Sequence, residues 1–392
     1  MFFVLVFGIL TLLHFYLWKR LVRDVARTRR VRRIGAVAVV SLAVLAVAAL
    51  MLPRLIGIEA GRWIAWPGYL WIALMFYLFV ALVVLELPRL ALRLRARRKA
   101  PALVGGSDAP ERDEPAVDDS RRLFLARGAA LVAGIAAPTV VGVGMVSALS
   151  APDVKRLTVP LRRLDPAFAG FRITVVSDIH LGPILGRSHT ERLVRMINET
   201  EPDLVAMVGD LADGTVAELG HAAEPLRDLV SREGTFFVTG NHEYYSGHQQ
   251  WITELDRLGL HYLRNDRTRI TRGGAGLDLA GVTDVTGESF DDGPDFGAAL
   301  RGRDAADPVV LLAHQPVQVE SAARAGVDLQ LSGHTHGGQI YPFHHIVSLQ
   351  QPSVSGLSKV DDTWLYVTNG AGFWGPPVRI GAPPDITVIE LR

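Results

Sequence analysis

Residues 171–180 read FRITVVSDIH, a run rich in β-branched residues that ends in the acid–imidazole pair Asp178 and His180. A segment with apolar residues at helical spacing follows at about 190–199, and another short apolar run comes at 203–208. Strands that alternate with helices predict an α/β domain built from βα units. This stretch therefore sets the fold class of the second half of the chain.

The same pattern recurs in this half. Five short apolar runs are followed directly by Asp, Asn or His. In sheets built from βα units, ligands bind beyond the carboxyl ends of the strands, so we expect these side chains to converge. A single Asp or His at such a position would more often be a helix cap or a core residue. Five separate explanations of this kind, at five equivalent strand ends, are hard to sustain. The converging residues are Asp178, His180, Asp210, Asp213, Asn241, His242, His314, His334 and His336.

Carboxylates and neutral imidazoles are suitable ligands for Zn, Mn or Fe, and the residue types do not choose among these metals. The chain contains no cysteine, which excludes thiolate ligands and disulfides. A carboxylate can bridge two ions about 3.5–4 Å apart, and such a pair can hold a hydroxide and a phosphoryl oxygen together. The sequence therefore predicts a site for two divalent metal ions.

At this point the chain resembles a known family. Asp-x-His at 178–180, Gly-Asp-x-x-Asp at 209–213, Gly-Asn-His-Glu at 240–243, His314 alone and Gly-His-x-His at 333–336 occur in the order of the calcineurin-like metallophosphoesterases. The resemblance covers about 157–392. Residues 333–339 (GHTHGGQ) are especially similar to the bacterial branch that is membrane-linked or exported by the twin-arginine pathway. The resemblance implies a four-layer α/β/β/α sandwich and hydrolysis of a phosphoester, with a phosphodiester favoured, through attack by metal-bound hydroxide.

The resemblance also implies roles for individual residues. His242 would contact phosphate and protonate the leaving oxygen, and Asp213 would orient a ligand such as His242 or His180. One metal would be held by Asp178, His180 and His336, the other by Asn241, His314 and His334, with Asp210 bridging both.

Four further residues are candidates for substrate binding. Arg379 matches an arginine that follows a Gly-x-Gly loop in this branch of the family. Tyr244 could line the pocket, but packing explains it equally well. Phe373 and Trp374 depart from the small or polar residues usual in that loop, and we expect them to contact an apolar part of the substrate or the bilayer surface. A buried hydrophobic plug is the alternative.

The first 150 residues are dominated by Leu, Val and Ala. Apolar segments lie at about 1–18, 34–58, 63–87 and 128–149, and the second and third are long enough to cross about 30 Å of hydrocarbon. Any one of them could be a buried core helix, but four in 150 residues predict an all-α membrane region of about four helices in 1–150. Residues 100–119 contain Pro, Gly and acids without apolar periodicity, which predicts a flexible linker.

Basic residues crowd the connections at 19–33 and 89–99, while the connection at 59–62 is nearly neutral. By the positive-inside rule the first two connections are cytoplasmic, which predicts a multi-pass protein of the cell membrane with its catalytic domain on the extracytoplasmic side. The net charge of +1, with basic clusters beside apolar spans, gives no case for nucleic acid as a partner.

Residues 120–125 (SRRLFL) are similar to the recognition motif of twin-arginine export signals, which are addresses read by a receptor. This similarity implies the twin-arginine export machinery as a partner. Alternatively, Arg121 and Arg122 are cytoplasmic charges that only set topology. Cleavage near Ala148 or Ala151 would release the domain from the fourth span.

The function predicted from the sequence is a membrane-anchored phosphoesterase with two metals, acting on a lipid-linked or cell-envelope substrate. Two alternatives come from other classes. One is an inactive receptor or scaffold that keeps the metal site, which retention of His242 argues against. The other is an effector domain of a membrane sensor or transporter, which the scarcity of charged residues inside the spans disfavours.

Overall fold

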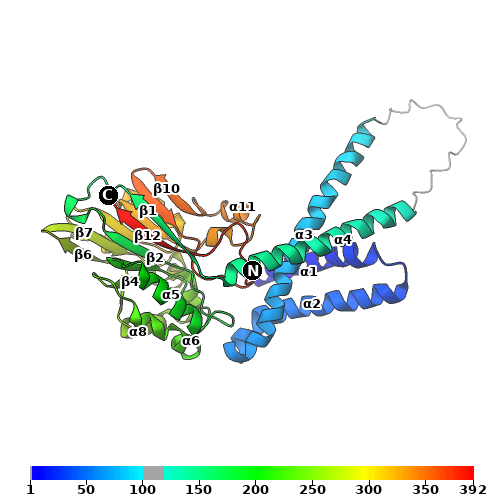
Figure 1. Ribbon diagram of the computed structural model, residues 1–392, viewed down its shortest axis with the longest axis horizontal. Helices are drawn as coiled ribbons and strands as arrows, with labels where there is room; N and C mark the ends of the chain where they lie inside the picture. Colours follow the sequence, from blue (N-terminus) through cyan, green and yellow to red (C-terminus); the bar gives the residue numbers. More distant parts are fainter. Residues whose placement is uncertain (1, 100–118) are drawn as a thin grey trace, which may run out of the picture. The chain divides into compact units, whose positions relative to one another are not determined.

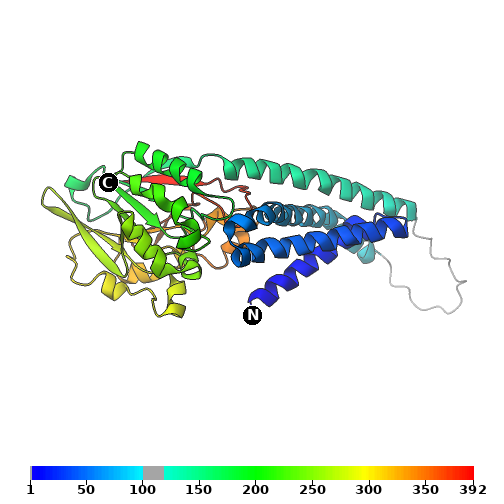
Figure 2. The same cartoon turned by 90° about the horizontal axis from the view of Figure 1, so that it is seen from below.

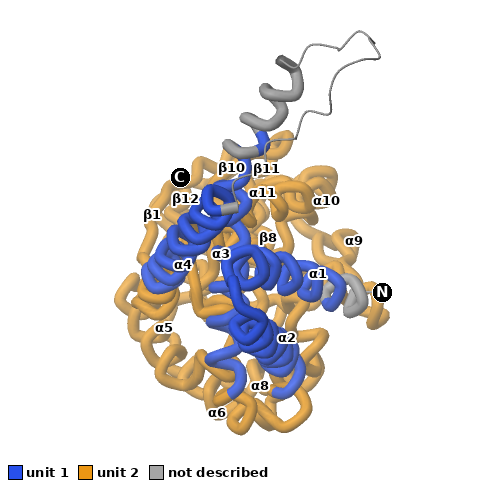
Figure 3. Tube along the Cα trace, turned by 90° about the vertical axis from the view of Figure 1, so that its right-hand side faces the viewer, with its two compact units in different colours: residues 1–52, 64–143 blue, residues 53–63, 144–392 orange. Residues whose placement is uncertain are grey.

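The computed structural model describes residues 2–99 and 119–392, which fall into two compact units (Figure 3). Unit 1 is Met1–Leu52 with Ile64–Val143, and unit 2 is Pro53–Trp63 with Gly144–Arg392. All but the last residue of the predicted linker at 100–119 lies outside the described residues. The domain limits predicted from the sequence, 1–150 and 157–392, are not tested by this division and remain predictions.

Unit 1 is built from long helices, which Figures 1 and 2 show from two sides. Three helical segments among the described residues are long and apolar enough to cross a membrane: Arg29–Ile56, Ile58–Leu87 and Ser120–Leu149. The first predicted span corresponds to a helix of 16 residues, about 24 Å long and shorter than the hydrocarbon core of a bilayer. A count of four spans therefore stays a prediction. The helical elements up to residue 149 are α1 (Phe2–Leu17), the π-helix η1 (Trp18–Arg23), α2 (Arg29–Ile56), α3 (Ile58–Lys99) and α4 (Asp119–Leu149).

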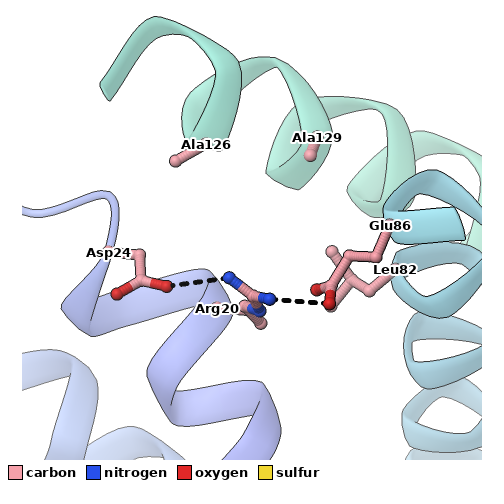
Figure 4. Close-up of a pocket in the computed structure, with 6 residues that line it drawn as sticks. All are labelled: Arg20, Asp24, Leu82, Glu86, Ala126 and Ala129. Carbon is pink, nitrogen blue, oxygen red and sulfur yellow. Dashed lines mark hydrogen bonds and ion pairs between the residues drawn. The ribbon is translucent and has the colours of Figure 1, made fainter. Parts of the chain in front are cut away.

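A polar cluster joins the helices of unit 1. Arg20 of η1 lies between two carboxylates, 3.2 Å from Asp24 and 2.6 Å from Glu86 of α3 (Figure 4). The hydroxyl of Tyr16 donates a 2.7 Å hydrogen bond to Glu86, and Leu82, Ala126 and Ala129 complete the lining of the same small pocket. Charged groups among apolar helices are costly unless they are paired, so this cluster lets α1 and α3 pack without an isolated charge.

Unit 2 contains two mixed six-stranded sheets, which confirms the α/β prediction for this half of the chain. All five strands predicted from the apolar runs are present. In the first sheet β2 to β5 run parallel, and in the second β7, β8, β9 and β11 run parallel. The first sheet has the order β1 (Asp153–Val159), β12 (Asp385–Leu391), β2 (Arg172–Val176), β3 (Leu204–Val208), β4 (Thr235–Val238), β5 (Leu260–Tyr262), and the second the order β10 (Gly356–Val360), β11 (Thr363–Val367), β9 (Leu329–Ser332), β8 (Val309–Leu312), β7 (Ala275–Gly281), β6 (Asp266–Arg272).

Helices pack on the outer faces of these sheets. All residues of strand β3 are apolar because both of its faces are buried. Leu204 and Val208 pack in the core between the sheets, while Val205 and Met207 face α5, α6 and α8 on the other side. Strands β7 and β8 pack in the same way against α9 and α10. The helices of unit 2 are α5 (Arg187–Glu199), α6 (Val216–Ala223), α7 (Asn241–Ser246), α8 (His248–Arg257), α9 (Phe296–Ala299), α10 (Val319–Arg324) and α11 (His344–Val347), with short 3-10 turns η2 (Pro166–Phe168), η3 (Glu224–Asp228), η4 (Val285–Phe290), η5 (Pro316–Gln318) and η6 (His336–Gly338).

Candidate metal centre

The carboxyl ends of five strands meet at one place in unit 2: β2, β3 and β4 from the first sheet, and β8 and β9 from the second. Each strand is followed directly by residues predicted to form the site, and these side chains come together as expected. Three groups have ligand atoms that all lie within 4.8 Å of one another: Asp178, His180 and His336; His180, Asp210 and His242; and Asp210, His314 and His334.

The first group combines one carboxylate with two imidazoles. Nε2 of His336 lies 3.3 Å from Oδ1 of Asp178 and 3.0 Å from Nε2 of His180. All three side chains are buried. Two ring nitrogens and a carboxylate oxygen therefore point at one small volume, an arrangement that a divalent cation could share.

Asn241 lies beside the group of Asp210, His314 and His334, with its Oδ1 3.0 Å from Nδ1 of His334. His314 supplies the clearest sign of a ligand. Its Nδ1 lies 2.7 Å from the carbonyl oxygen of Val208, which fixes that nitrogen as a donor and leaves Nε2 directed toward the site. Among the described residues this buried Nε2 has no hydrogen-bond partner, although Oδ2 of Asp210 is 3.2 Å away. The donor set therefore fits a divalent metal ion.

Asp210 lies between the imidazole of His314 on one side and that of His180 on the other. Its Oδ2 is 3.2 Å from Nε2 of His314 and 3.8 Å from Nε2 of His180, and its Oδ1 accepts a 2.8 Å hydrogen bond from the backbone of His242. Burial alone would raise the pKa of Asp210, but the surrounding imidazoles, His314 first among them, outweigh it and hold that pKa well below its usual value. An ionised carboxylate in this position could contribute an oxygen ligand to a cation on either side.

Asp213 contacts two imidazoles of the site. Its Oδ1 lies 2.8 Å from Nδ1 of His180 and 2.6 Å from Nδ1 of His242, so one carboxylate orients both rings. Burial would lower the pKa of His242, but the carboxylates of Asp210 and Asp213 outweigh that effect and raise it to about 9. These two carboxylates therefore favour the protonated form of His242.

Glu243 was missed by the sequence analysis, although its motif was noted. Its buried carboxylate accepts hydrogen bonds from the backbone of Asp210 at 2.9 Å and Gly240 at 2.7 Å through Oε2, and of Leu211 at 2.8 Å through Oε1. Gly240 is the N-cap of α7 and Glu243 its N3 residue, so a capping box was the available signal. Glu243 ties the loop that carries Asp210 to the loop that carries Asn241.

Glycines allow the loops to approach one another closely. A Cβ atom on Gly240 would lie 2.2 Å from Oδ1 of Asp210, and one on Gly333 would lie 2.2 Å from Oδ2 of Asp178. Any side chain at these two positions would displace a candidate ligand. Five candidate ligands themselves adopt left-handed backbone conformations: Asp178 (φ 52°), His180 (φ 48°), Asp210 (φ 54°), His334 (φ 70°) and His336 (φ 53°).

The four predicted substrate contacts fall into different environments. Trp374 is 49% exposed and its ring centroid lies 6.0 Å from that of His242, beside the site. Phe373 is buried against Ala148, which corresponds to the plug alternative. Tyr244 is buried and donates a 2.8 Å hydrogen bond to Asp292. Trp374 is therefore the one of these three that a substrate could touch without rearrangement.

Arg379 is fully buried behind the site. Its guanidinium donates to the carbonyl oxygens of His336 at 2.7 Å, Asn369 at 2.9 Å and Gly372 at 3.1 Å. Its Nη2 also lies 3.1 Å from Nδ1 of His336. These donors are directed to main-chain oxygens around His336. We therefore expect Arg379 to position the imidazole of His336.

Comparisons with known proteins agree with the geometry. Residues 171–338 match the family described as calcineurin-like phosphoesterase. A transmembrane protein with metallophosphoesterase domain from Danio rerio is 39% identical over 259 residues, covering 64% of this chain and 59% of that protein. The protein of the same name from Bos taurus is also 39% identical, covering 70% and 64%. An uncharacterised metallophosphoesterase from Aquifex aeolicus is 32% identical, covering 61% of this chain and 91% of that protein. The chain thus spans less than two thirds of the two vertebrate relatives.

Proposed function

Because the chain belongs to the calcineurin-like metallophosphoesterase family, we propose that it is a membrane-anchored phosphoesterase with two divalent metal ions, and that phosphodiesters are its substrates. The observation that carries the proposal is the position of Asp210 between two groups of ligand atoms, one with Asp178, His180 and His336 and the other with Asn241, His314 and His334. The buried, unpartnered Nε2 of His314 supports it further.

Two bound cations would supply charge stabilisation for the phosphoryl oxygens and activation of a water molecule. The protein's own groups account for the rest of the chemistry. His242 is held by Asp213 and kept protonated by its carboxylate neighbours, so it can donate a proton to the leaving oxygen. Trp374, exposed beside His242, provides an apolar surface for the part of the substrate that carries the leaving group.

The test is hydrolysis of bis(p-nitrophenyl) phosphate and p-nitrophenyl phosphate by the purified full chain with Mn, Fe or Zn. Asp210→Asn should lower turnover by more than roughly 100-fold and reduce the bound metal measured by elemental analysis, because it removes the shared carboxylate. Asp256→Asn, the same chemical change on the exposed face of α8, is the matched control. Equal turnover by the parent and Asp210→Asn would favour the inactive scaffold instead. Hydrolysis of the monoester alone would contradict the diesterase assignment.

We further propose that the catalytic unit lies outside the cytoplasm and acts on a lipid-linked or cell-envelope substrate. Its fold would be a four-layer sandwich, preceded in the chain by four membrane spans. Support comes from the three long apolar helices, the basic connections at 19–33 and 89–99, and relatives named as transmembrane proteins. Residues 120–125 form the start of α4 and would direct the folded domain to the twin-arginine machinery. Replacing Arg121 and Arg122 by Lys should abolish external activity; unchanged export would reduce the pair to topology charges.

A further inference from the structure

An exposed apolar segment follows the last candidate ligand of the site. In residues 341–349, the large side chains of Tyr341, Phe343, Ile346 and Leu349 are 55%, 41%, 53% and 83% exposed. Single exposed apolar residues are ordinary on a protein surface, but four within nine residues indicate a contact surface. The segment includes the short helix α11 (Figure 1) and is called the 341–349 loop below.

The composition around this loop suits a lipid surface better than a protein partner with charged groups. Between Asp328 and Lys359 the sequence contains no Asp, Glu, Lys or Arg. Contact with lipid therefore removes no formally charged side chain of this stretch from water. Tyr341 stacks on His344 with ring centroids 4.9 Å apart, and rings of this amphipathic kind are typical of the membrane–water boundary.

The loop is also connected to the end of a membrane-spanning helix through contacts inside unit 2. The backbone of Tyr341 donates a 3.0 Å hydrogen bond to Ile380, and Ile340 pairs with Ile380 in an isolated bridge. The adjacent Arg379 backbone donates a 2.9 Å hydrogen bond to Gly144 of α4. A Cβ on Gly144 would lie 2.5 Å from Val378, so the helix backbone contacts the segment 378–380 directly.

Gly144 lies within the apolar helix Ser120–Leu149, near the end at which the chain leaves it. Residues 378–380 therefore link the 341–349 loop to the last turns of a candidate span, and the end of a span lies near the boundary of the bilayer. We propose that the 341–349 loop inserts Ile346 and Leu349 into the surface of the bilayer that α4 crosses. The inference rests on the proposed membrane anchoring and is independent of the reaction catalysed.

Because the chain has no cysteine, one engineered thiol reports one position. In the experiment, the full chain carrying Leu349→Cys is labelled with an environment-sensitive fluorophore and reconstituted in phosphatidylcholine–phosphatidylglycerol vesicles. The control is Val230→Cys, which is 66% exposed and lies just before β4, at the sheet edge opposite the strand ends that form the site. We expect a blue-shifted emission and a several-fold stronger quenching by nitroxide-labelled lipids at position 349 than at position 230.

Emission at position 349 that is as water-exposed and as weakly quenched as at position 230 would overturn the proposal. A blue shift that depends on protein density, without quenching by lipid, would instead assign the loop to contact with a second copy. Hydrolysis of a soluble phosphodiester by the same labelled protein shows that it is folded, and its failure in the parent would concern the proposed function alone. Should labelling at 349 abolish folding, Ile346→Cys takes its place with the same expected outcome.

Discussion

Replacing Glu243 by Gln should weaken the metal centre, although this residue binds no metal itself. In the protein, Oε2 of Glu243 accepts hydrogen bonds from the backbone of Gly240 at 2.7 Å and Asp210 at 2.9 Å, and Oε1 accepts them from Leu211 at 2.8 Å and Ala212 at 3.4 Å. An amide of the same shape keeps one oxygen. Its NH2 group must then face one of these two pairs of N–H donors.

Whichever pair of donors the amide oxygen faces, at least one buried N–H group of the other pair loses its acceptor. Each orphaned donor costs about 1–3 kcal/mol, and the opposed NH2 group adds a similar desolvation penalty, giving about 2–6 kcal/mol in the free energy of unfolding. For a domain of this size, 1 kcal/mol shifts the melting temperature by about 2–4 °C, so the expected decrease is roughly 5–20 °C.

The assay is thermal unfolding of the full chain in detergent, followed by intrinsic tryptophan fluorescence, together with metal content by elemental analysis. Glu218→Gln is the matched control, because Glu218 occupies the same N3 position of a capping box in α6 but its bonds to Thr215 are at the surface. Its expected cost is about 1 kcal/mol or less. The reasoning fails if the two variants have the same melting temperature and the same metal content as the parent.

Three further outcomes are expected. Arg379→Lys should lower metal content and kcat with KM unchanged, because the guanidinium positions His336; a raised KM with full metal content would restore the role in substrate binding. His189 is buried, and burial lowers its pKa to about 4, so the unfolded chain binds more protons between about pH 4 and 6.5 and stability falls as the pH falls through that window. His189→Gln should remove up to about 2 kcal/mol of this loss in unfolding curves at pH 7 and pH 5. Arg20→Met should destabilise the helices by up to about 3–5 kcal/mol because it leaves Glu86 and Asp24 without their cation, and adding Glu86→Gln should recover part of this loss in detergent unfolding; no recovery would argue against the pair.

The convergence of the metal ligands could be predicted because local and global signals agree. Each candidate ligand follows closely after a short, mostly apolar strand, and the carboxyl ends of parallel strands share one edge of a sheet. Asp178 and His334 are 156 residues apart, yet the backbone N–H of His334 donates a 3.0 Å hydrogen bond to the carboxylate of Asp178. The pattern of strand ends required no knowledge of which strands pair.

The supporting residues could not be predicted in this way. Glu243 resembles any acidic residue in the first turn of a helix, and only the fold shows that its carboxylate enters the loop of Asp210. Arg379 follows two prolines in a loop with no periodic pattern, and its acceptors are main-chain carbonyls that every residue possesses. The same limit applies to Arg20 and Glu86, whose pairing depends on how α1 and α3 cross. Contacts to backbone and contacts between distant helices leave little trace in residue type.

The left-handed ligands show where the free energy of folding is used in this domain. Residues such as Asp178, His180 and Asp210 hold conformations that cost about 1–3 kcal/mol each and persist only where the surroundings impose them. Here the surroundings are other site loops: the backbone of Asp178 donates to Gly209 at 3.0 Å, that of His180 to Asp210 at 3.2 Å, and that of Asp213 to Leu181 at 2.8 Å. Each loop after one strand thus needs the loop after the next, so the ligand geometry exists only once the sheet has formed. The geometry that a metal ion would select is therefore available only in the folded domain.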